Sequence, residues 1–344
     1  MALPALADVR RQFVGATLAV AAREGLAPVF ESVPGVDAII RLLARGNLVK
    51  RWRSDAEALT SGGFDLAILF PNSLYSAWIV KQARVPERWG YRADFRRAFL
   101  TRSVRRPRGT IHRAEYYQTL VRALGISSGP LRPYVPVPDQ DRSAAEKLLE
   151  REGWTRLVSL VGLAPGAAYG FAKQWPPQYF GAVAASLVEH GIWCVLVGLP
   201  ADRTVGQQVM AAFERSGTSV RAEQPAGRIL NLIGRTDIHQ LMGLMTFCGS
   251  FVANDSGAGY LAAAIGVPVV AMFGPTDVRV AAPLPAPNFT GTHTSLTHPV
   301  FCSPCWLREC PIDHRCMKRI APARVFDAVM QQLTTPVRPE EFKQ

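Results

Sequence analysis

The sequence predicts an α/β protein built from two doubly wound domains. Two observations lead to this fold class: apolar runs alternate with helical patterns along the chain, and its 344 residues amount to about two domains. The apolar runs are 16–23, 37–42 and 64–70 in the first half, and 156–163, 192–199, 251–255 and 267–274 in the second. Because each run is apolar throughout, it is typical of a parallel strand covered on both faces.

Helix signals follow the strands of the second half in the order that a doubly wound domain requires. A helix is expected over 176–190, since Pro176 and Pro177 suit a first turn, where a missing N–H needs no partner. Asp237 is the predicted N-cap of a further helix, and Gly266 ends the helix that follows strand 251–255.

A proline-rich stretch separates the two halves. Residues 127–141 contain four prolines and several polar residues, which is typical of a linker. We therefore expect an N-terminal domain over 1–140 and a C-terminal domain, closed by a helix, over 141–344.

The chain opens on a helical pattern, with Leu3, Leu6, Val9 and Phe13 on one face. A doubly wound domain normally opens on a strand that leads into its first ligand-facing loop. The first strand of the N-terminal domain is therefore expected to be missing.

The net positive charge of the chain indicates which kinds of partner it binds. Lys and Arg number 39 and Asp and Glu number 27, and the net charge of +12 suggests nucleic acid, an anionic membrane surface or a phosphorylated substrate. Nucleic acid is disfavoured, because no basic and aromatic stacking platform or recognition helix stands out. The chain has no apolar run of about 18 residues and meets Asp8 and Arg10 before a signal-peptide core forms, so it is predicted to be cytoplasmic.

Small and polar residues gather where the second-half strands end, the edge at which open α/β sheets bind ligands. Strand 251–255 runs into Asp255, Ser256 and Gly257, and a glycine-rich helix N-terminus there suits a diphosphate. Lys173, at the end of a small-residue loop, is a candidate phosphate contact. The alternatives are a capped helix without a ligand and a solvated lysine.

Three further positions lie at the same edge. Asp202 follows strand 192–199 and is either an N-cap or an acceptor of a bond from ribose. Thr236 and Asp237 either line an adenine pocket or start a helix, and residues 274–277 are consistent with a plain turn. Each of these residues alone is weak evidence for a ligand site. Because all of them are expected at the same edge of one sheet, together they predict a nucleotide site.

Arginine is concentrated in the first half, at 50–53, 90–97 and 102–108. Guanidinium groups bind phosphate and carboxylate with two parallel hydrogen bonds, so these segments fit an anionic ligand. A basic surface with no ligand is the alternative.

Four cysteines, Cys302, Cys305, Cys310 and Cys316, lie close together near His314. Thiolates at short spacings are good zinc ligands, but this spacing is not that of the usual paired knuckles. We keep reduced structural thiols as the prediction and assign no metal.

Four segments together resemble the ADP-heptose:lipopolysaccharide heptosyltransferases, and the heptosyltransferase II branch in particular. They are LAPGAAYGFAKQWPPQYF, NLIGRTDIHQLMGLM, FVANDSGAGYLAAAIGVPVVAMFGPTD and CxxCxxxxCPIDHRCM. FDLAILFPNS and GYRADFR in the first half are similar to the same family. The resemblance covers nearly the whole chain, and its motifs are specific in combination.

The resemblance implies a GT-B fold, in which two Rossmann-like domains face a cleft. It implies an inverting single displacement that moves L-glycero-D-manno-heptose from ADP-heptose to the lipopolysaccharide inner core, heptosyl-Kdo-lipid A, with no metal and no cofactor. The donor is expected in the C-terminal domain and the acceptor in the N-terminal domain. Because the acceptor is a lipid, peripheral contact with the inner face of the inner membrane is expected.

The resemblance also implies the site residues. The donor diphosphate is expected near Lys173 and the helix start, the ribose near Asp202 and the adenine near Thr236. The whole donor set is Lys173, Asp202, Thr236, Asp255, Ser256, Gly257, Ala258, Gly259 and Tyr260. The acceptor set, which would face Kdo carboxylates and lipid A phosphates, is Asn72, Arg92 and Arg96.

Two departures from the family pattern stand out. Family members begin with a strand and a loop ending in Gly-Asp, a few residues before the Met-Ala-Leu-Pro found here at 1–4, and that Asp is the expected general base. We therefore assign no base in this chain, Asp8 included, and expect the strand to be encoded upstream of Met1. Tyr260 stands where the family usually has His, and it donates a hydrogen bond without carrying positive charge.

Two other functions stay open. One is a non-catalytic or degenerate GT-B-like protein that binds nucleotide or glycan, and the other is a GT-B enzyme that uses another nucleotide sugar. An in-frame upstream strand ending in Gly-Asp favours the enzyme, whereas a stop codon there favours the non-catalytic protein.

Overall fold

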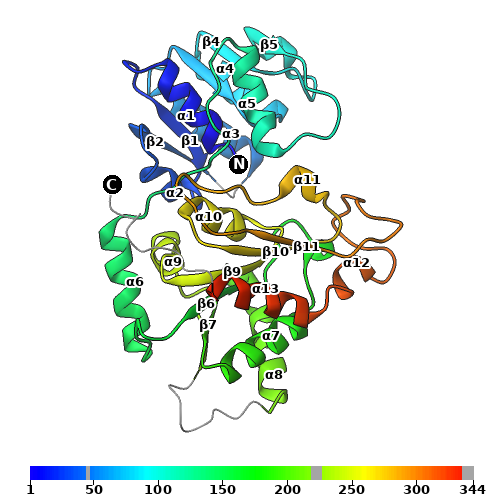
Figure 1. Ribbon diagram of the computed structural model, residues 1–344. Helices are drawn as coiled ribbons and strands as arrows, with labels where there is room; N and C mark the ends of the chain where they lie inside the picture. Colours follow the sequence, from blue (N-terminus) through cyan, green and yellow to red (C-terminus); the bar gives the residue numbers. More distant parts are fainter. Residues whose placement is uncertain (44–46, 218–226, 335–344) are drawn as a thin grey trace. The chain divides into compact units, whose positions relative to one another are not determined.

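The computed structural model divides the chain into two compact units, Met1–Leu131 and Arg132–Gln344 (Figure 1). It describes residues 1–43, 47–217 and 227–334. The division falls inside the proline-rich stretch 127–141, whereas the sequence placed the boundary after residue 140. The helix α6 (Asp139–Arg151) accounts for the difference, because it packs on α9 (Ile238–Met245) and so draws the end of this stretch into the second unit.

The second unit is built on one sheet of six parallel strands, in the order β11-β10-β9-β6-β7-β8. The strands are β6 (Leu160–Ala164), β7 (Trp193–Leu196), β8 (Ile229–Asn231), β9 (Cys248–Asn254), β10 (Val269–Phe273) and β11 (Thr294–Thr297). Each of the four apolar runs predicted in this half overlaps a strand. The predicted α/β class with parallel sheets is confirmed.

Two strands of this sheet escape the sequence prediction, and one begins later than expected. β8 and β11 are short edge strands, and their sequences ILN and TSLT are too short or too polar to stand out as apolar runs. β6 begins at Leu160 rather than Arg156 because the Trp154 indole N–H donates to the Val158 carbonyl oxygen (3.0 Å) and holds a turn there.

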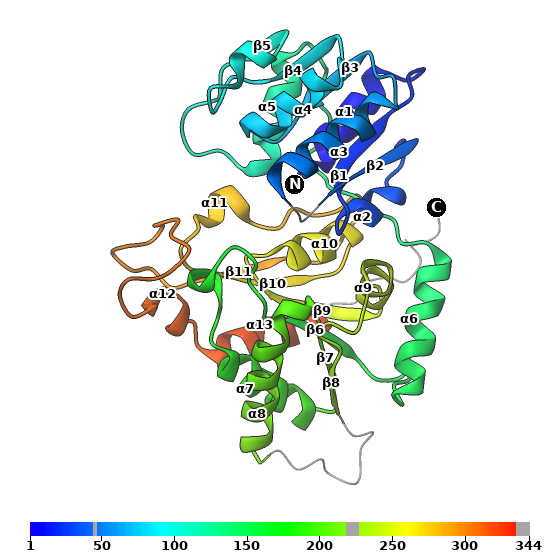
Figure 2. The same ribbon diagram turned by 180° about the vertical axis from the view of Figure 1, so that it is seen from behind.

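Helices cover both faces of this sheet (Figures 1 and 2). α7 (Pro177–Glu189) and α13 (Pro322–Thr334) pack together on one side, and α9 and α10 (Gly257–Ile265) pack together as well. The other helical segments are α8 (Arg203–Arg215), α11 (Val278–Ala281), α12 (Arg315–Lys318) and the 3₁₀ turns η2 (Phe171–Lys173) and η3 (Pro200–Asp202). The predicted caps are confirmed: Asp237 accepts from the Gln240 N–H (2.8 Å), and Gly266 ends α10 with φ 100°.

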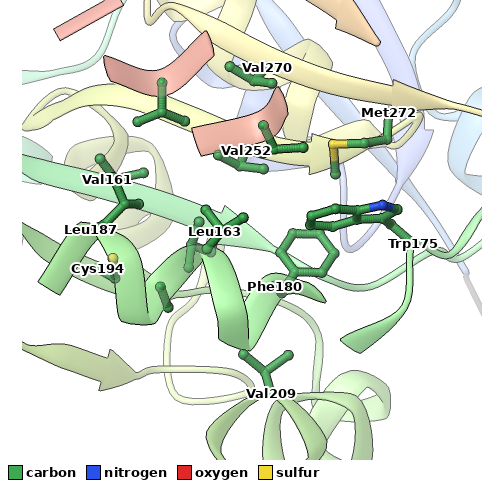
Figure 3. Packing of buried hydrophobic residues seen from close by; sticks show 14 of the residues in the cluster. Val161, Leu163, Trp175, Phe180, Leu187, Cys194, Val209, Val252, Val270 and Met272 are labelled. Carbon is green, nitrogen blue, oxygen red and sulfur yellow. The ribbon is translucent and has the colours of Figure 1, made fainter. Parts of the chain in front are cut away.

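The core of this unit lies between the sheet and the helices α7 and α13 (Figure 3). The strand residues that line it are Val161, Leu163, Val252, Val270 and Met272. They meet Phe180 and Leu187 of α7, and Trp175 has no exposed surface among them. The Trp175 indole N–H donates to the Ile320 carbonyl oxygen (3.0 Å), so this large side chain is buried with its polar atom satisfied.

The strand order creates a switch point between β6 and β9. From β6 the chain continues to β7 and β8 on one side, and from β9 it continues to β10 and β11 on the other. The loops after β6 and β9 therefore diverge, and ligands of open α/β sheets bind in the crevice that such loops leave at the carboxyl ends of the strands. Lys173 lies in the first of these loops and Asp255 begins the second.

The first unit contains two parallel sheets in its described residues. β1 (Ala19–Arg23) pairs with β2 (Ala38–Leu42), while β4 (Glu87–Tyr91) lies between β3 (Leu66–Leu69) and β5 (Arg102–Val104). Its helical segments are α1 (Leu3–Gln12), α2 (Ala27–Glu31), α3 (Leu48–Thr60), α4 (Leu74–Gln82), α5 (Arg113–Ala123) and η1 (Arg96–Phe99). The predicted opening helix is α1, and the three predicted runs hold β1, β2 and β3. Across the described ranges, no helix has both the length and the apolar character needed to cross a bilayer.

β4 and β5 escape the prediction because charged side chains interrupt them. The Arg88 Nε of β4 donates to the Phe99 carbonyl oxygen (2.7 Å), and the Arg102 guanidinium of β5 lies 5.0 Å from the Trp89 ring centroid. The arginine-rich segments 90–97 and 102–108 therefore contain strand residues as well as residues outside the strands.

Asp8 anchors α1 within the first unit. Its buried carboxylate accepts hydrogen bonds from the Gly129 N–H (2.9 Å) and the Gln118 side-chain amide (2.9 Å), and it pairs with Arg11. These contacts join α1 to α5 and to the start of the proline-rich stretch. Asp8 therefore has a structural role, and the structure offers no reason to make it a base.

His293 makes the stability of the second unit depend on pH. Burial lowers the His293 pKa from its usual 6.5 to about 4, so between those values the unfolded chain binds a proton that the folded chain excludes. We expect the free energy of unfolding to fall as the pH drops through this range, and His293→Phe to make that fall shallower. Urea unfolding at a series of pH values measures both, and identical profiles for the two proteins would contradict the assignment.

Candidate functional site

Asn254, the last residue of β9, holds the loop that follows β6. Its side-chain amide donates to the carbonyl oxygens of Pro165 (2.9 Å) and Gly166 (3.1 Å), at the start of the loop. Its Oδ1 accepts from the Trp175 N–H (2.9 Å), at the end of the loop. One buried amide thus fixes both ends of the loop that carries Lys173.

Lys173 and Asp255 form a buried ion pair at the switch point. Their side chains are 5% and 2% exposed, and the Lys173 ammonium bonds Oδ2 of the aspartate. The Tyr260 hydroxyl donates to Oδ1, and the ammonium also lies 4.6 Å from the centroid of the Tyr169 ring. The structure therefore brings three predicted donor residues together, and Asp255 is engaged by Lys173 and Tyr260 instead of capping α10.

The N-terminus of α10, which follows this pair, lacks a side-chain cap. Ser256 occupies the N-cap position, but its Oγ is buried and bonds no group in the described part of the chain. Gly257 and Ala258 begin the helix, and Gly259 packs so closely that a Cβ there would lie 3.2 Å from the Ala253 Cβ. Uncapped N–H groups beside an unpartnered hydroxyl are suited to an anion.

Asp202 reaches the same sheet edge from the loop after β7. Its Oδ2 accepts from the Leu199 N–H (2.8 Å), which closes the η3 turn. Asp202 also occupies the predicted N-cap position, at the start of α8, but its side chain makes no capping hydrogen bond to that helix among the described residues. The carboxylate also packs against Gly166, where a Cβ would lie 2.5 Å from it. Asp202 therefore lies beside the start of the loop that carries Lys173.

Thr236 lies in the turn between β8 and α9 and is half-buried. The Gly234 N–H donates to the Gly198 carbonyl oxygen (3.0 Å), which joins this turn to the one that leads to Asp202. The residues expected near ribose and adenine therefore share one end of the edge, with Lys173 and Asp255 at its middle.

The loop after β10 is more than a plain turn. Asp277 caps α11 by accepting from the Arg279 N–H (2.9 Å), as a turn residue does. Thr276 is 3% exposed, however, and its hydroxyl has no partner within the described ranges. A buried hydroxyl of this kind calls for a hydrogen-bonding group, and the sequence did not single it out.

The four clustered cysteines line one pocket together with His314. All of them are free thiols, and burial raises the pKa of the Cys316 thiol, which favours its neutral form. Among the residues that the structure describes, no three or more Cys, His, Asp or Glu side chains are arranged to hold a metal ion.

Arg96 of the first unit is fully buried, although we expected it to face an acceptor. Its Nε donates to the Tyr91 carbonyl oxygen (2.8 Å), and one terminal nitrogen donates to the Ser76 hydroxyl (3.1 Å) and the Pro71 carbonyl oxygen. Arg96 thus ties the ends of β3 and β4 together. Its second terminal nitrogen is buried and has no hydrogen-bond partner among the described residues.

Asn72 and Arg92 lie at the carboxyl ends of β3 and β4. The Asn72 amide donates to the Tyr116 hydroxyl (2.7 Å), and its Oδ1 is buried without a partner among the described residues. Arg92 is half-buried, and its backbone N–H donates to the Val104 carbonyl oxygen (2.8 Å). Both residues therefore stand at the edge where a ligand of this unit is expected.

Arg23, Arg51 and Tyr75 form a basic and aromatic cluster that the predicted site residues do not include. Each guanidinium lies 5.4 Å from the centroid of the Tyr75 ring. The Tyr75 hydroxyl donates to the buried Asp55 carboxylate, and burial together with this bond raises the Tyr75 pKa to about 12. The sequence held a signal for this cluster, since Arg23 ends an apolar run and Arg51 belongs to the basic segment 50–53.

Comparison with known proteins places this chain in a family. Residues 52–314 match glycosyltransferase family 9 (heptosyltransferase). The lipopolysaccharide heptosyltransferase 2 of Salmonella typhimurium is 30% identical over 269 residues, which cover 75% of this chain and 74% of that protein. The lipooligosaccharide heptosyltransferase 2 of Haemophilus influenzae is 29% identical over 229 residues, and the match covers 64% of this chain and 63% of that protein, slightly under two thirds of its length.

Solved structures share the fold along almost the whole chain. The ADP-heptose lipopolysaccharide heptosyltransferase II of Escherichia coli has a TM-score of 0.75 at 24% identity, with 96% of this chain and 94% of that chain covered. A family 9 glycosyltransferase of Veillonella parvula has a TM-score of 0.77 at 20% identity, with 96% and 92% covered. The expected GT-B fold class is thereby confirmed.

The family match identifies this α/β protein with parallel sheets as a glycosyltransferase. Because the family match spans most of the sequence, the chain belongs to glycosyltransferase family 9 (heptosyltransferase).

The buried ion pair generates a stability prediction. We expect Asp255→Ala to lower the free energy of unfolding by about 3–5 kcal/mol, because it leaves the Lys173 ammonium buried without its partner. The double variant Lys173→Met, Asp255→Leu removes both charges. Its free energy of unfolding is expected to fall by less than that of Asp255→Ala. Urea unfolding of wild type, Lys173→Met, Asp255→Leu and the double variant measures the coupling, and strictly additive losses would refute it.

Proposed function

We propose that this glycosyltransferase is inverting and moves L-glycero-D-manno-heptose from ADP-heptose to the heptosyl-Kdo-lipid A inner core of lipopolysaccharide. The observation that carries the proposal is the buried Lys173–Asp255 pair followed by the uncapped N-terminus of α10. The names of the matching relatives support heptose as the transferred sugar. The similar fold of the Escherichia coli protein, which is named for ADP-heptose, supports ADP as the carrier of that sugar.

In the proposed step, the acceptor hydroxyl oxygen bonds to the anomeric carbon while the bond from that carbon to the β-phosphate oxygen breaks. The electron pair leaves with ADP, so negative charge grows on the β-phosphate. Lys173, the first N–H groups of α10 and the Ser256 hydroxyl are the groups proposed to meet this charge. Groups held where charge develops stabilise the transition state more than the ground state. The hydroxyl proton passes to a base that we assign to no residue of this chain, and the step uses no metal or cofactor.

Asp255 and Tyr260 are proposed to orient Lys173 for this role. Burial penalises an isolated charge, and Asp255 offsets that penalty by pairing with the ammonium. Since an ammonium has three donors, Lys173 can keep its bond to Asp255 and still donate to the diphosphate. Tyr260 donates to Asp255 without adding a second positive charge. Asp202 and Thr236 are proposed to lie near the ribose and the adenine.

The acceptor is proposed to bind the first unit. Residues 1–131 hold 20 of the 39 Lys and Arg but 10 of the 27 Asp and Glu, so they carry +10 of the net charge of +12. Asn72, Arg92 and the cluster of Arg23 and Arg51 are the candidate contacts with Kdo carboxylates and lipid A phosphates, with Arg96 behind them. Contact with the inner face of the inner membrane, from the cytoplasmic side, is proposed to be peripheral and electrostatic.

The alternative is a GT-B-like protein that binds a nucleotide sugar or glycan without transferring it. The observation that favours it is the structural use of Asp8, whose carboxylate is engaged by Gln118 and Gly129. A transferase with another nucleotide sugar is a further alternative, favoured by Tyr260 in place of the usual His.

One assay separates these functions. ADP release and heptose incorporation are measured with ADP-heptose and heptosyl-Kdo-lipid A, with ADP-glucose as the matched donor. The proposal expects both signals with ADP-heptose alone. Binding of ADP-heptose without transfer would support the non-catalytic alternative, and faster turnover of ADP-glucose would support another donor.

Lys173 is the residue whose change tests the leaving-group contact. We expect Lys173→Met to lower kcat per folded molecule by about 10²- to 10³-fold, the usual effect of losing one group that stabilises developing charge. The KM of the acceptor is expected to stay within about twofold, since Lys173 is proposed to touch the donor alone. Lys147→Met, an exposed lysine of α6, is the control. Unchanged kcat in Lys173→Met would remove this residue from the diphosphate site.

Arg51 tests the acceptor site. We expect Arg51→Ala to raise the acceptor KM by about 10-fold, because a hydrogen bond between charged groups is lost, and to leave the ADP-heptose KM unchanged. The effect is expected to shrink at high salt, which screens exposed charges. Arg53→Ala, at an exposed position of the same basic segment, is the control. An equal effect of both changes would point to general charge rather than a site.

A further inference from the structure

The segment 301–316 carries the four clustered cysteines and is called the cysteine segment below. It makes hydrogen bonds to the loop that carries Lys173. Ala172 precedes Lys173 directly, and both of its backbone groups are bound by this segment. Its N–H donates to the Arg308 carbonyl oxygen (2.9 Å), and its carbonyl oxygen accepts from His314 Nε2 (2.8 Å). The peptide next to the lysine is therefore held from both sides.

Other residues of this loop also contact the cysteine segment. The Tyr169 hydroxyl donates to the Trp306 carbonyl oxygen (2.8 Å), and the rings of Phe171 and His314 lie 5.1 Å apart. Gly170, with φ 153°, lets the backbones approach, because a Cβ there would run into the backbone of Arg308. Each loop residue from 169 to 172 thus meets the cysteine segment.

His314 is suited to hold the Ala172 carbonyl. It is 5% exposed, and burial lowers its pKa, which favours a neutral ring. A neutral ring with its proton on Nε2 donates one hydrogen bond in a fixed direction. The buried ring therefore acts as a rigid donor to the loop.

The cysteine segment is also anchored to the loop after β10. The Ser303 hydroxyl donates to the Gly274 carbonyl oxygen (2.5 Å), and the N–H groups of Cys305 (3.1 Å) and Trp306 (2.9 Å) donate to the Pro275 carbonyl oxygen. Because β9 lies between β6 and β10 in the sheet, the segment bridges the two loops that flank Asp255. It thereby links the position of the Lys173 loop to the strands on both sides of its ion-pair partner.

We propose that the cysteine segment is the positioning element of the donor site, and that His314 is the positioning residue that sets where the Lys173 ammonium lies. This inference rests on the proposed function, in which that ammonium meets the leaving diphosphate. Asn254 already holds both ends of the loop, at Pro165, Gly166 and Trp175. What the cysteine segment adds is a hold on the peptide next to the lysine.

The test compares two substitutions of His314. His314→Phe keeps a ring against Phe171 but removes the donor, whereas His314→Gln restores an N–H at a similar reach. We expect His314→Phe to lower kcat by about 10- to 100-fold, as for a reacting group displaced by about 1 Å, with the acceptor KM unchanged. ADP binding, measured by calorimetry, is expected to weaken as well, and His314→Gln to recover most of both losses. His293→Phe, at a half-buried histidine of the same unit, is the control.

Each outcome decides the proposal. Wild-type kcat and ADP affinity in His314→Phe, or equal losses in the phenylalanine and glutamine variants, would overturn it, the second by showing a structural role alone. If the wild type transfers no heptose but binds ADP, weaker binding in His314→Phe supports the positioning role while the proposed function fails. A wild type that neither transfers heptose nor binds ADP overturns both. Where His314→Phe does not fold, His314→Met takes its place.

Discussion

The ion pair between Lys173 and Asp255 is the constraint on which the proposed donor site depends. A buried ammonium is tolerated only next to a counter-charge, so the loop after β6 and the end of β9 must stay together. Neither residue is held by its own contact alone. The Asn254 amide fixes the ends of the loop, and the hydroxyl of Tyr260 occupies the second carboxylate oxygen of Asp255. The surrounding hydrogen bonds thus serve to keep one charge in one place.

The parallel sheet explains why such an arrangement arises here. In the order β10-β9-β6, the carboxyl ends of three adjacent strands lead to the Gly274 turn, to Asp255 and to the Lys173 loop. Strands of one parallel sheet bring distant segments to a common edge, and the cysteine segment then spans that edge by backbone hydrogen bonds. A late part of the chain therefore holds, by hydrogen bonds, a loop near the start of the same unit.

The strands that are buried on both faces could be predicted from the sequence, because burial requires continuous apolar residues. The strands that form mainly by hydrogen bonding to a neighbouring strand could not be predicted. Continuous apolar runs located β6, β7, β9 and β10, whereas β4 and β8 form because neighbouring strands offer hydrogen bonds to short or charged segments. Lys173 and Asp255 were both predicted as candidate site residues, but their pairing across 82 positions was not predicted. Arg96 looked like a surface cation because composition does not reveal that carbonyl oxygens will enclose it.

The distribution of charge separates the two units more sharply than the total does. In the second unit the buried Lys173 ammonium is neutralised by Asp255, so the first N–H groups of α10 and the Ser256 hydroxyl must contribute to binding any diphosphate there. The excess of arginine lies in the first unit, where Arg23 and Arg51 flank Tyr75 and where most of the net charge of +12 resides. A site whose buried charges neutralise each other suits a small donor that must be held in one orientation. Many arginines with a net positive charge suit a large anionic acceptor, which they attract electrostatically. In the proposed function, the second unit therefore orients the donor and the first unit attracts the acceptor.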